Sequence, residues 1–186
     1  MTQEKHRVSF NSSQITFLWR AMSSLLNFFG VALLGYASLT VFVYWTQDSL
    51  LFYPSSSDPD LERLYQGYKI SFDAEEAELH GWFIPGSDSV RPNLVFYGGN
   101  GQELSRSIDS ITSIGNCNYV FVNYRGYGSS TGKPSEEHLK SDALLILDAL
   151  ADQKRIELAN TVIMGRRLGT GVATYVAANR NIKGLV

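Results

Sequence analysis

The segment TVIMGRRLGTG (residues 161–171) passes from an apolar run into a glycine-rich turn. The apolar run is typical of a buried strand, and the residues after the turn favour a helix. Gly165 and Gly169 lie two residues before and two residues after Arg167. This is the spacing of the G-x-S-x-G turn, in which a strained backbone presents a central serine between a strand and a helix. The segment therefore predicts such a turn, with Arg167 in the place of the serine.

Apolar runs and helical patterns alternate from residue 68 to the last residue. We expect strands at residues 68–72, 79–83, 93–97, 119–122, 161–164 and 183–186, and helices at residues 104–114, 135–150 and 168–178. Uniformly apolar strands that alternate with helices predict an α/β fold, with a mostly parallel sheet and helices on both faces. Ligands bind at the carboxyl ends of such strands, where glycine-bearing loops follow Tyr97, Tyr124 and Met164.

The glycine-bearing loops do not match the phosphate-binding patterns of nucleotide-binding proteins. In GYGSSTGKP, Lys133 is followed by Pro134 instead of Ser or Thr, and Tyr127 stands where a P-loop begins with glycine. In GGNGQEL, Leu104 occupies the third glycine position of the dinucleotide-binding pattern. We therefore expect no nucleotide and no other cofactor.

Length and composition exclude several other classes of protein. A chain of 186 residues leaves room for one globular domain. Its 44% hydrophobic and 18% charged residues exclude a disordered tail or a coiled coil. A net charge of -2 without a basic block argues against nucleic acid as a partner. One cysteine and three histidines without paired spacing predict neither a disulfide nor a metal site.

The N-terminal region contains a long apolar segment. No residue from 21 to 47 carries a charge, and about 20 apolar residues suffice to cross a bilayer as a helix. Tyr44 and Trp45 lie where aromatic side chains gather at a membrane interface. We expect a transmembrane signal anchor at residues 21–47, with the lipid bilayer as its partner. A cleaved signal peptide is the alternative, which the length of the run and of its leader disfavours. A buried core helix is disfavoured because the segment is apolar on every face.

Basic residues set the expected orientation of this anchor. Lys5, Arg7 and Arg20 precede it, whereas Arg63 is the one basic residue in the matching window after it. The positive-inside rule therefore predicts that residues 1–20 lie in the cytoplasm.

The rest of the chain divides into a short connection and a folded domain. Residues 48–67 contain Pro54 and Pro59 and are expected as an irregular linker. Residues 68–186 carry the alternating strands and helices, and we expect them to form one domain on the far side of the membrane.

Five short motifs are spread over the chain: FYP at residues 52–54, GWFIP at 81–85, GGNGQ at 98–102, NYRGYGSSTGKPSE at 123–136 and GRRLGTGVA at 165–173. Together with the anchor, they resemble the membrane-anchored serine hydrolases of the α/β-hydrolase superfamily. The resemblance implies a transmembrane helix followed by an α/β-hydrolase fold. In that family the acid and the histidine of the catalytic triad lie after later strands. We therefore expect an incomplete, C-terminally truncated fold that ends before them.

The same resemblance assigns roles to the turn and to the loop after the third strand. The backbone N–H of Leu168 and Asn100 would stabilise the negative charge of a tetrahedral intermediate. Gly165 and Gly169 are the glycines of the nucleophile elbow, and Arg167 occupies the position of the nucleophile. Because a guanidinium stays protonated, Arg167 cannot attack a carbonyl carbon. We therefore expect a chain without an intact catalytic site.

Three functions are compatible with these residues. An inactive relative of the serine hydrolases is favoured, because His80 and His138 are interpreted as surface or packing residues instead of a catalytic base. A non-enzymatic, membrane-tethered binding domain is the second. The third is an active acyl hydrolase whose missing part lies in another chain or in an extension. Only in that third case do we expect a small acyl or ester substrate.

Two features of the sequence predict limited stability. A charge at a partly buried site is costly, so Arg167 must reach solvent, pair with a carboxylate or distort the turn. A sheet that ends at residues 183–186 leaves an apolar edge, and such an edge favours self-association.

Overall fold

The computed structural model describes residues 11–87 and 91–186 of the chain. Contacts between residues divide the chain into two compact units, Met1–Gln47 and Asp48–Val186. Lys5 and Arg7, on which the expected orientation in the membrane partly depends, lie outside the described residues.

The described residues of the N-terminal unit belong almost entirely to one long helix, α1 (Ser12–Leu51), whose last residues fall within the second unit. Its 40 residues correspond to a length of about 60 Å, against about 30 Å for the hydrocarbon core of a bilayer. None of its residues is buried, although the mean hydropathy of its most apolar window is 1.8. The helix is therefore long and apolar enough to cross a membrane, as both an anchor and a signal sequence would be.

The second unit is built on a six-stranded sheet with the order β1-β2-β4-β3-β5-β6. The strands are β1 (Lys69–Ala74), β2 (Ala77–Ile84), β3 (Asn93–Tyr97), β4 (Asn118–Val122), β5 (Thr161–Gly165) and β6 (Gly184–Leu185). Strands β1, β2 and β4 pair antiparallel, and β4, β3, β5 and β6 pair parallel. The expected α/β fold with a mostly parallel sheet is confirmed.

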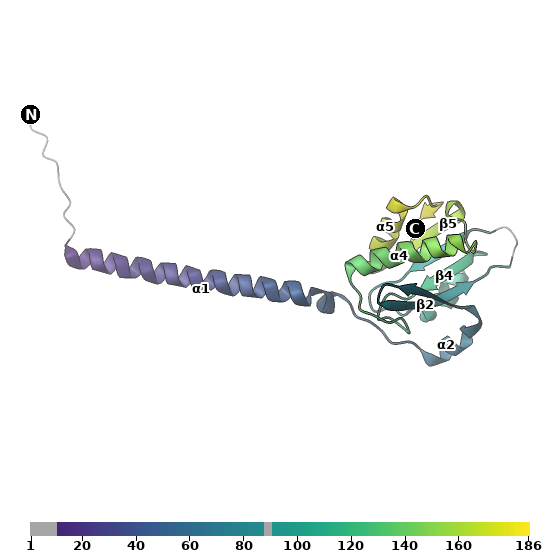
Figure 1. The fold of residues 1–186 in the computed structure, drawn as a ribbon, viewed down its shortest axis with the longest axis horizontal. Helices are drawn as coiled ribbons and strands as arrows, with labels where there is room; N and C mark the ends of the chain where they lie inside the picture. Colours follow the sequence, from purple (N-terminus) through teal and green to yellow (C-terminus); the bar gives the residue numbers. More distant parts are fainter. Residues whose placement is uncertain (1–10, 88–90) are drawn as a thin grey trace, which may run out of the picture. The chain divides into compact units, whose positions relative to one another are not determined.

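Helices cover both faces of this sheet (Figure 1). One face carries α4 (Glu136–Asp152) and α5 (Leu168–Asn179), and the other carries α2 (Pro59–Leu64), η2 (Leu104–Ser107) and α3 (Ile108–Thr112). Two further short 3-10 helices are η1 (Gln66–Tyr68) and η3 (Leu158–Asn160). The core is split accordingly, because alternate residues of a strand point to opposite faces. In β3, Val95 and Tyr97 pack with α4 and α5, whereas Leu94 and Phe96 pack on the opposite side.

The expected irregular linker at residues 48–67 is in fact largely structured. Its residues form the end of α1, the helix α2 and the start of η1. Asp58 caps α2 by accepting a hydrogen bond from the backbone N–H of Asp60, and Pro59 occupies the first turn. Phe52 and Tyr65 are buried in the two halves of the core. Pro59 was therefore a helix-start signal, whereas Pro54 lies in an irregular segment.

The single helix expected at residues 104–114 is replaced by η2 and the five-residue α3. Serine side chains in this segment bond to the backbone, as Ser110 Oγ does to the Ser107 carbonyl and Ser113 Oγ to the Ser110 carbonyl. Such bonds compete with the regular hydrogen bonds of a helix.

Candidate functional site

The turn between β5 and α5 has the backbone of a nucleophile elbow. Arg167 has φ 53° and ψ -113°, in a region that residues with a Cβ rarely adopt. Such a conformation costs about 1–3 kcal/mol and persists where the surrounding structure holds it. The chain thus passes from strand to helix within two residues, Arg166 and Arg167, and the strained one is the central residue of the motif.

Close packing around the elbow explains its two glycines. A Cβ on Gly169 would lie 2.1 Å from the carbonyl oxygen of Tyr97, at the end of β3. A Cβ on Gly165 would lie 2.6 Å from the carbonyl oxygen of Gly169. Both contacts are far too short for a real side chain, so α5 packs this closely against β3 and β5 only with glycine at these positions.

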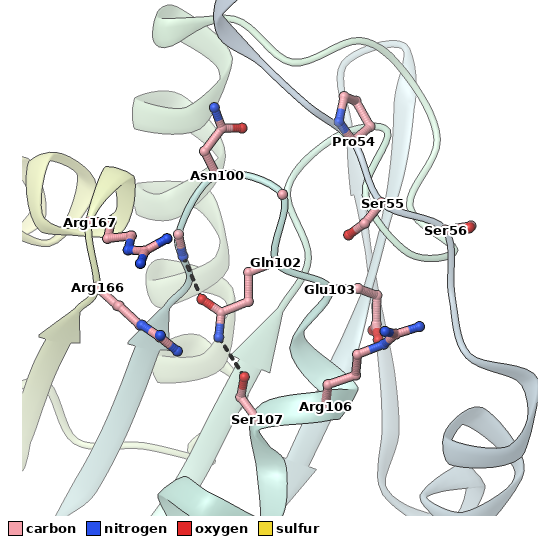
Figure 2. Close-up of a pocket in the computed structure, with 12 residues that line it drawn as sticks. Pro54, Ser55, Ser56, Asn100, Gln102, Glu103, Arg106, Ser107, Arg166 and Arg167 are labelled. Carbon is pink, nitrogen blue, oxygen red and sulfur yellow. Dashed lines mark hydrogen bonds between the residues drawn. The ribbon is translucent and has the colours of Figure 1, made fainter.

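The loop after β3 faces the elbow and is held by side-chain hydrogen bonds. The backbone N–H of Gly99 donates to Gln102 Oε1 at 2.8 Å, and Gln102 Nε2 donates to Ser107 Oγ at 2.6 Å (Figure 2). On its other side, Tyr124 Oη–H donates to the carbonyl oxygen of Gly98 at 3.0 Å. A Cβ on Gly99 would lie 3.5 Å from the Cβ of Arg167, so the loop and the elbow are in direct contact.

Asn100, the expected second oxyanion donor, uses its side chain for a different purpose. Its Oδ1 accepts hydrogen bonds from the backbone N–H of Tyr53 at 2.9 Å and from Tyr127 Oη–H at 2.7 Å. Its Nδ2 donates to the carbonyl oxygen of Leu51 at 2.5 Å. The side chain therefore ties the FYP segment to the loop, and Figure 2 shows it on the side away from Gln102.

Two backbone groups remain as candidate donors at the elbow. Within residues 11–87 and 91–186, the backbone N–H groups of Asn100 and Leu168 have no hydrogen-bond partner. Leu168 begins α5, so its N–H is among the groups that a helix leaves unpaired. Both groups are thus available to an anion.

A cavity of about 520 Å³ lies beside the elbow (Figure 2). It is lined by residues 54–56, 99–103, Arg106, Ser107, Arg166 and Arg167. Arg166 and Arg167 are exposed, and within the described part of the chain neither guanidinium has an ion-pair or hydrogen-bond partner. Of the three outcomes expected for Arg167, the structure thus has the first, exposure to solvent.

A buried network of polar side chains holds the loop after β3, and it was not predicted from the sequence. The carboxylate of Glu103 accepts hydrogen bonds from the backbone N–H and hydroxyl of Ser105 and from Asn123 Nδ2 at 3.1 Å. Asn123 Oδ1 in turn accepts a hydrogen bond from the Leu104 N–H at 2.9 Å. In the sequence, this network is indicated only by a charged residue, Glu103, and an amide, Asn123, at the edges of two glycine-rich motifs.

The two histidines in the described part of the chain, His80 and His138, lie away from the cavity. His80 is in β2, with Nε2 3.7 Å from Glu78 Oε1, and His138 is in α4, with Nδ1 3.1 Å from the carbonyl oxygen of Lys133. Neither lines the cavity at the elbow. The described residues also contain no cluster of three His, Cys, Asp or Glu side chains that would hold a metal ion.

Known proteins share this fold and parts of this sequence, although no protein-family model matches the chain. The alpha/beta hydrolase domain-containing protein WAV2 of Arabidopsis thaliana is 28% identical over 165 residues, which are 82% of this chain and 52% of that protein. The alpha/beta hydrolase domain-containing protein 17C of Mus musculus is 33% identical over 110 residues, which are 58% of this chain and 34% of that protein. The crystal structure of an alpha-beta hydrolase from Vibrio vulnificus aligns with a TM-score of 0.58 and 26% identity, over 69% of this chain and 49% of that one. The chain thus spans between about a third and a half of the length of these relatives.

Proposed function

Because the chain belongs to the α/β-hydrolase superfamily, we propose that it is a member whose elbow does not carry out acyl transfer. The observation that carries the proposal is Arg167, at φ 53° in the position from which a serine would attack. Acyl transfer needs a nucleophile with a free electron pair and a base that takes its proton. The guanidinium of Arg167 offers neither, because it stays protonated at any physiological pH.

The rest of the elbow supports a binding function. The cavity, the two unpaired backbone N–H groups and the tightly packed glycines are all present. A site that has hydrogen-bond donors but no nucleophile binds a ligand without cleaving it. We therefore favour a binding function over hydrolysis, and the greater length of the relatives does not change this, because Arg167 would remain at the elbow.

Labelling with a fluorophosphonate probe tests this proposal, since the probe reacts with activated serines. We expect no labelling of the full chain in detergent, while an active serine hydrolase in the same preparation is labelled. Arg167→Ser alone should also remain unlabelled, because His80 and His138 lie away from the cavity. Stoichiometric labelling of the unaltered chain would refute the proposal. Labelling of the serine variant would reveal a base near the elbow and restore the hydrolase interpretation.

We further propose that α1 anchors the protein in a membrane through residues 21–47, with the N-terminus in the cytoplasm. The supporting observation is an exposed helix of 40 residues with an uncharged stretch inside it. Protease added to intact cells or spheroplasts should then digest the second unit. Digestion only after lysis would reverse the orientation. A mature chain whose mass lacks the N-terminal residues up to about residue 47 would identify a cleaved signal peptide instead.

A further inference from the structure

We propose that the cavity at the elbow binds a phosphate group, using Arg166 and Arg167 as its main cationic ligands. This inference rests on the proposed function, because it assigns a ligand to a site that has no attacking serine. Both side chains line the cavity and extend from the elbow toward the loop that carries Gln102 (Figure 2). Within the described residues, no carboxylate neutralises either of them.

The balance of charge around the cavity is positive. Three guanidiniums line it, those of Arg106, Arg166 and Arg167, against one carboxylate, that of Glu103. Glu103 is 1% exposed, and its oxygens already accept hydrogen bonds from Ser105 and Asn123. Arg106 forms an ion pair with Asp58, with 3.7 Å between Nη2 and Oδ2. The positive charges left free for a ligand are therefore those of Arg166 and Arg167.

An unpartnered hydroxyl points to a polar ligand as well. Ser55 Oγ is shielded from solvent and has no hydrogen-bond partner, although Ser55 lines the same cavity. Buried polar atoms are nearly always paired, and an orphan of this kind indicates a missing partner. Figure 2 shows this hydroxyl on the side of the FYP segment that faces the loop with Gln102. A ligand in the cavity reaches Ser55 Oγ only if the segment at residues 54–56 moves, because less than 1 Å² of this atom is exposed.

Phosphate fits these features better than a carboxylate does. A phosphate monoester carries a charge of about −1.5 to −2 near neutral pH, which matches two free guanidiniums. Arginine binds it through two parallel hydrogen bonds, and the unpaired N–H groups of Asn100 and Leu168 add neutral donors. The volume of about 520 Å³ exceeds that of bare phosphate, so the ligand has room for an organic substituent. The same phosphate chemistry occurs in lipid head groups and in soluble monoesters.

Binding to the full chain in neutral detergent micelles tests the proposal by calorimetry. The soluble arm uses inorganic phosphate and glycerol phosphate, and the lipid arm uses micelles doped with phosphatidic acid against micelles with phosphatidylcholine alone. We expect saturable binding in at least one arm. The arm that binds identifies the source of the phosphate. Absence of saturable binding in both arms would overturn the proposal.

Substitutions assign the binding to the elbow. Arg166→Gln and Arg167→Gln should each weaken binding by about tenfold or more, the loss expected for a charge-assisted hydrogen bond. Arg63→Gln is the matched control, because its side chain is 75% exposed on α2 and does not line the cavity. Unchanged thermal melting without ligand shows that the variants remain folded. If Arg63→Gln weakened phosphate binding equally, the loss would follow from net charge alone. That result would refute the proposed site.

The two proposals fail in different ways. Fluorophosphonate labelling of the unaltered chain would remove the proposed function, whatever the phosphate result. An unlabelled chain that binds no phosphate would remove only the ligand assignment, and the elbow would remain non-catalytic.

Discussion

Arg167 combines a strained backbone with a side chain that stabilises nothing else in the fold. Its φ of 53° is suited to glycine, and its guanidinium has no partner among the described residues. Arg166 is the natural comparison, because it is also exposed and has no positive φ. The strain of the elbow is therefore retained although the serine that it presents in a hydrolase is absent.

Replacing Arg167 by glycine should stabilise the protein. Arg167→Gly relieves the strain and loses no hydrogen bond or ion pair among the described residues, so we expect a gain of about 1 kcal/mol after the entropic cost of glycine. Arg166→Gly has no strain to relieve and should lose about 0.5–1 kcal/mol. Urea denaturation of the two variants measures the difference. A loss of stability in both would show that the positive φ costs the fold nothing.

A buried ion pair fixes the NYRGYG loop to α4. Arg125 Nε and Nη2 each donate to a carboxylate oxygen of Asp142 at 2.8 Å, and Nη1 donates to the carbonyl oxygen of Glu75 at 2.7 Å. The two side chains are 5% and 8% exposed. These hydrogen bonds raise the pKa of the Arg125 guanidinium further, so the charge is permanent and depends on its partner.

Asp142→Ala should therefore be strongly destabilising. Removing one member leaves an uncompensated buried charge, which costs about 3–5 kcal/mol. The exposed pair of Lys140 and Glu136 on the same helix is the control, and Lys140→Ala should cost at most about 1 kcal/mol. Chemical denaturation compares the two. A loss below about 1 kcal/mol for Asp142→Ala would mean that Arg125 finds water or another acceptor.

At the scale of elements, local patterns predicted most of the fold. The apolar run at residues 93–97 matches β3 residue for residue, and the helix expected at residues 135–150 corresponds to α4, which Ser135 caps. The helix α2 was missed because its proline, Pro59, was assigned to a loop. The division of residues 104–114 into η2 and α3 was missed because the spacing of a few apolar residues does not distinguish a 3-10 turn from an α-helical one.

The candidate site was less predictable than the elements. The spacing of Gly165 and Gly169 indicated the elbow, since that constraint is local. The side-chain role of Asn100 depends on partners 47 and 49 residues away in the sequence, which no local pattern reveals. The exposure of Arg167 likewise depends on how the loop after β3 approaches the elbow.

The contact between α5 and β3 predicts opposite effects for two glycines of one helix. A Cβ at Gly169 would meet the Tyr97 carbonyl oxygen at 2.1 Å, so Gly169→Ala must displace α5 and should cost about 1–3 kcal/mol. Gly171 has no atom within 4 Å of its ideal Cβ, and Gly171→Ala should gain about 0.5–1 kcal/mol. Thermal melting of both variants shows directly whether each substitution lowers or raises the stability of the protein. Equal effects would contradict the close packing at the elbow.

At the scale of the whole second unit, the edge of the sheet at β6 is open. Strand β6 is only two residues long and pairs with β5 alone among the described strands. Leu185 and Val186 are exposed by 46% and 70%. Beside them lies an apolar hollow of about 240 Å³, whose lining includes Phe96, Ile111 and Met164. This combination of an open strand and apolar surface is the kind that pairs with another chain.

We therefore expect the 186-residue chain to associate through β6 in a concentration-dependent way. Leu185→Lys places a charge on the open strand and should shift the chain toward the monomer, because a charged edge resists pairing. Leu64→Lys is the matched control, since Leu64 is 65% exposed at the end of α2 and should leave association unchanged. Sedimentation in a density-matched detergent measures the association of the protein alone. Both variants keep α1, so a difference between them reports on association through β6. A monodisperse unaltered chain, or an equal response to both lysines, would show that β6 is not the surface through which the chains meet.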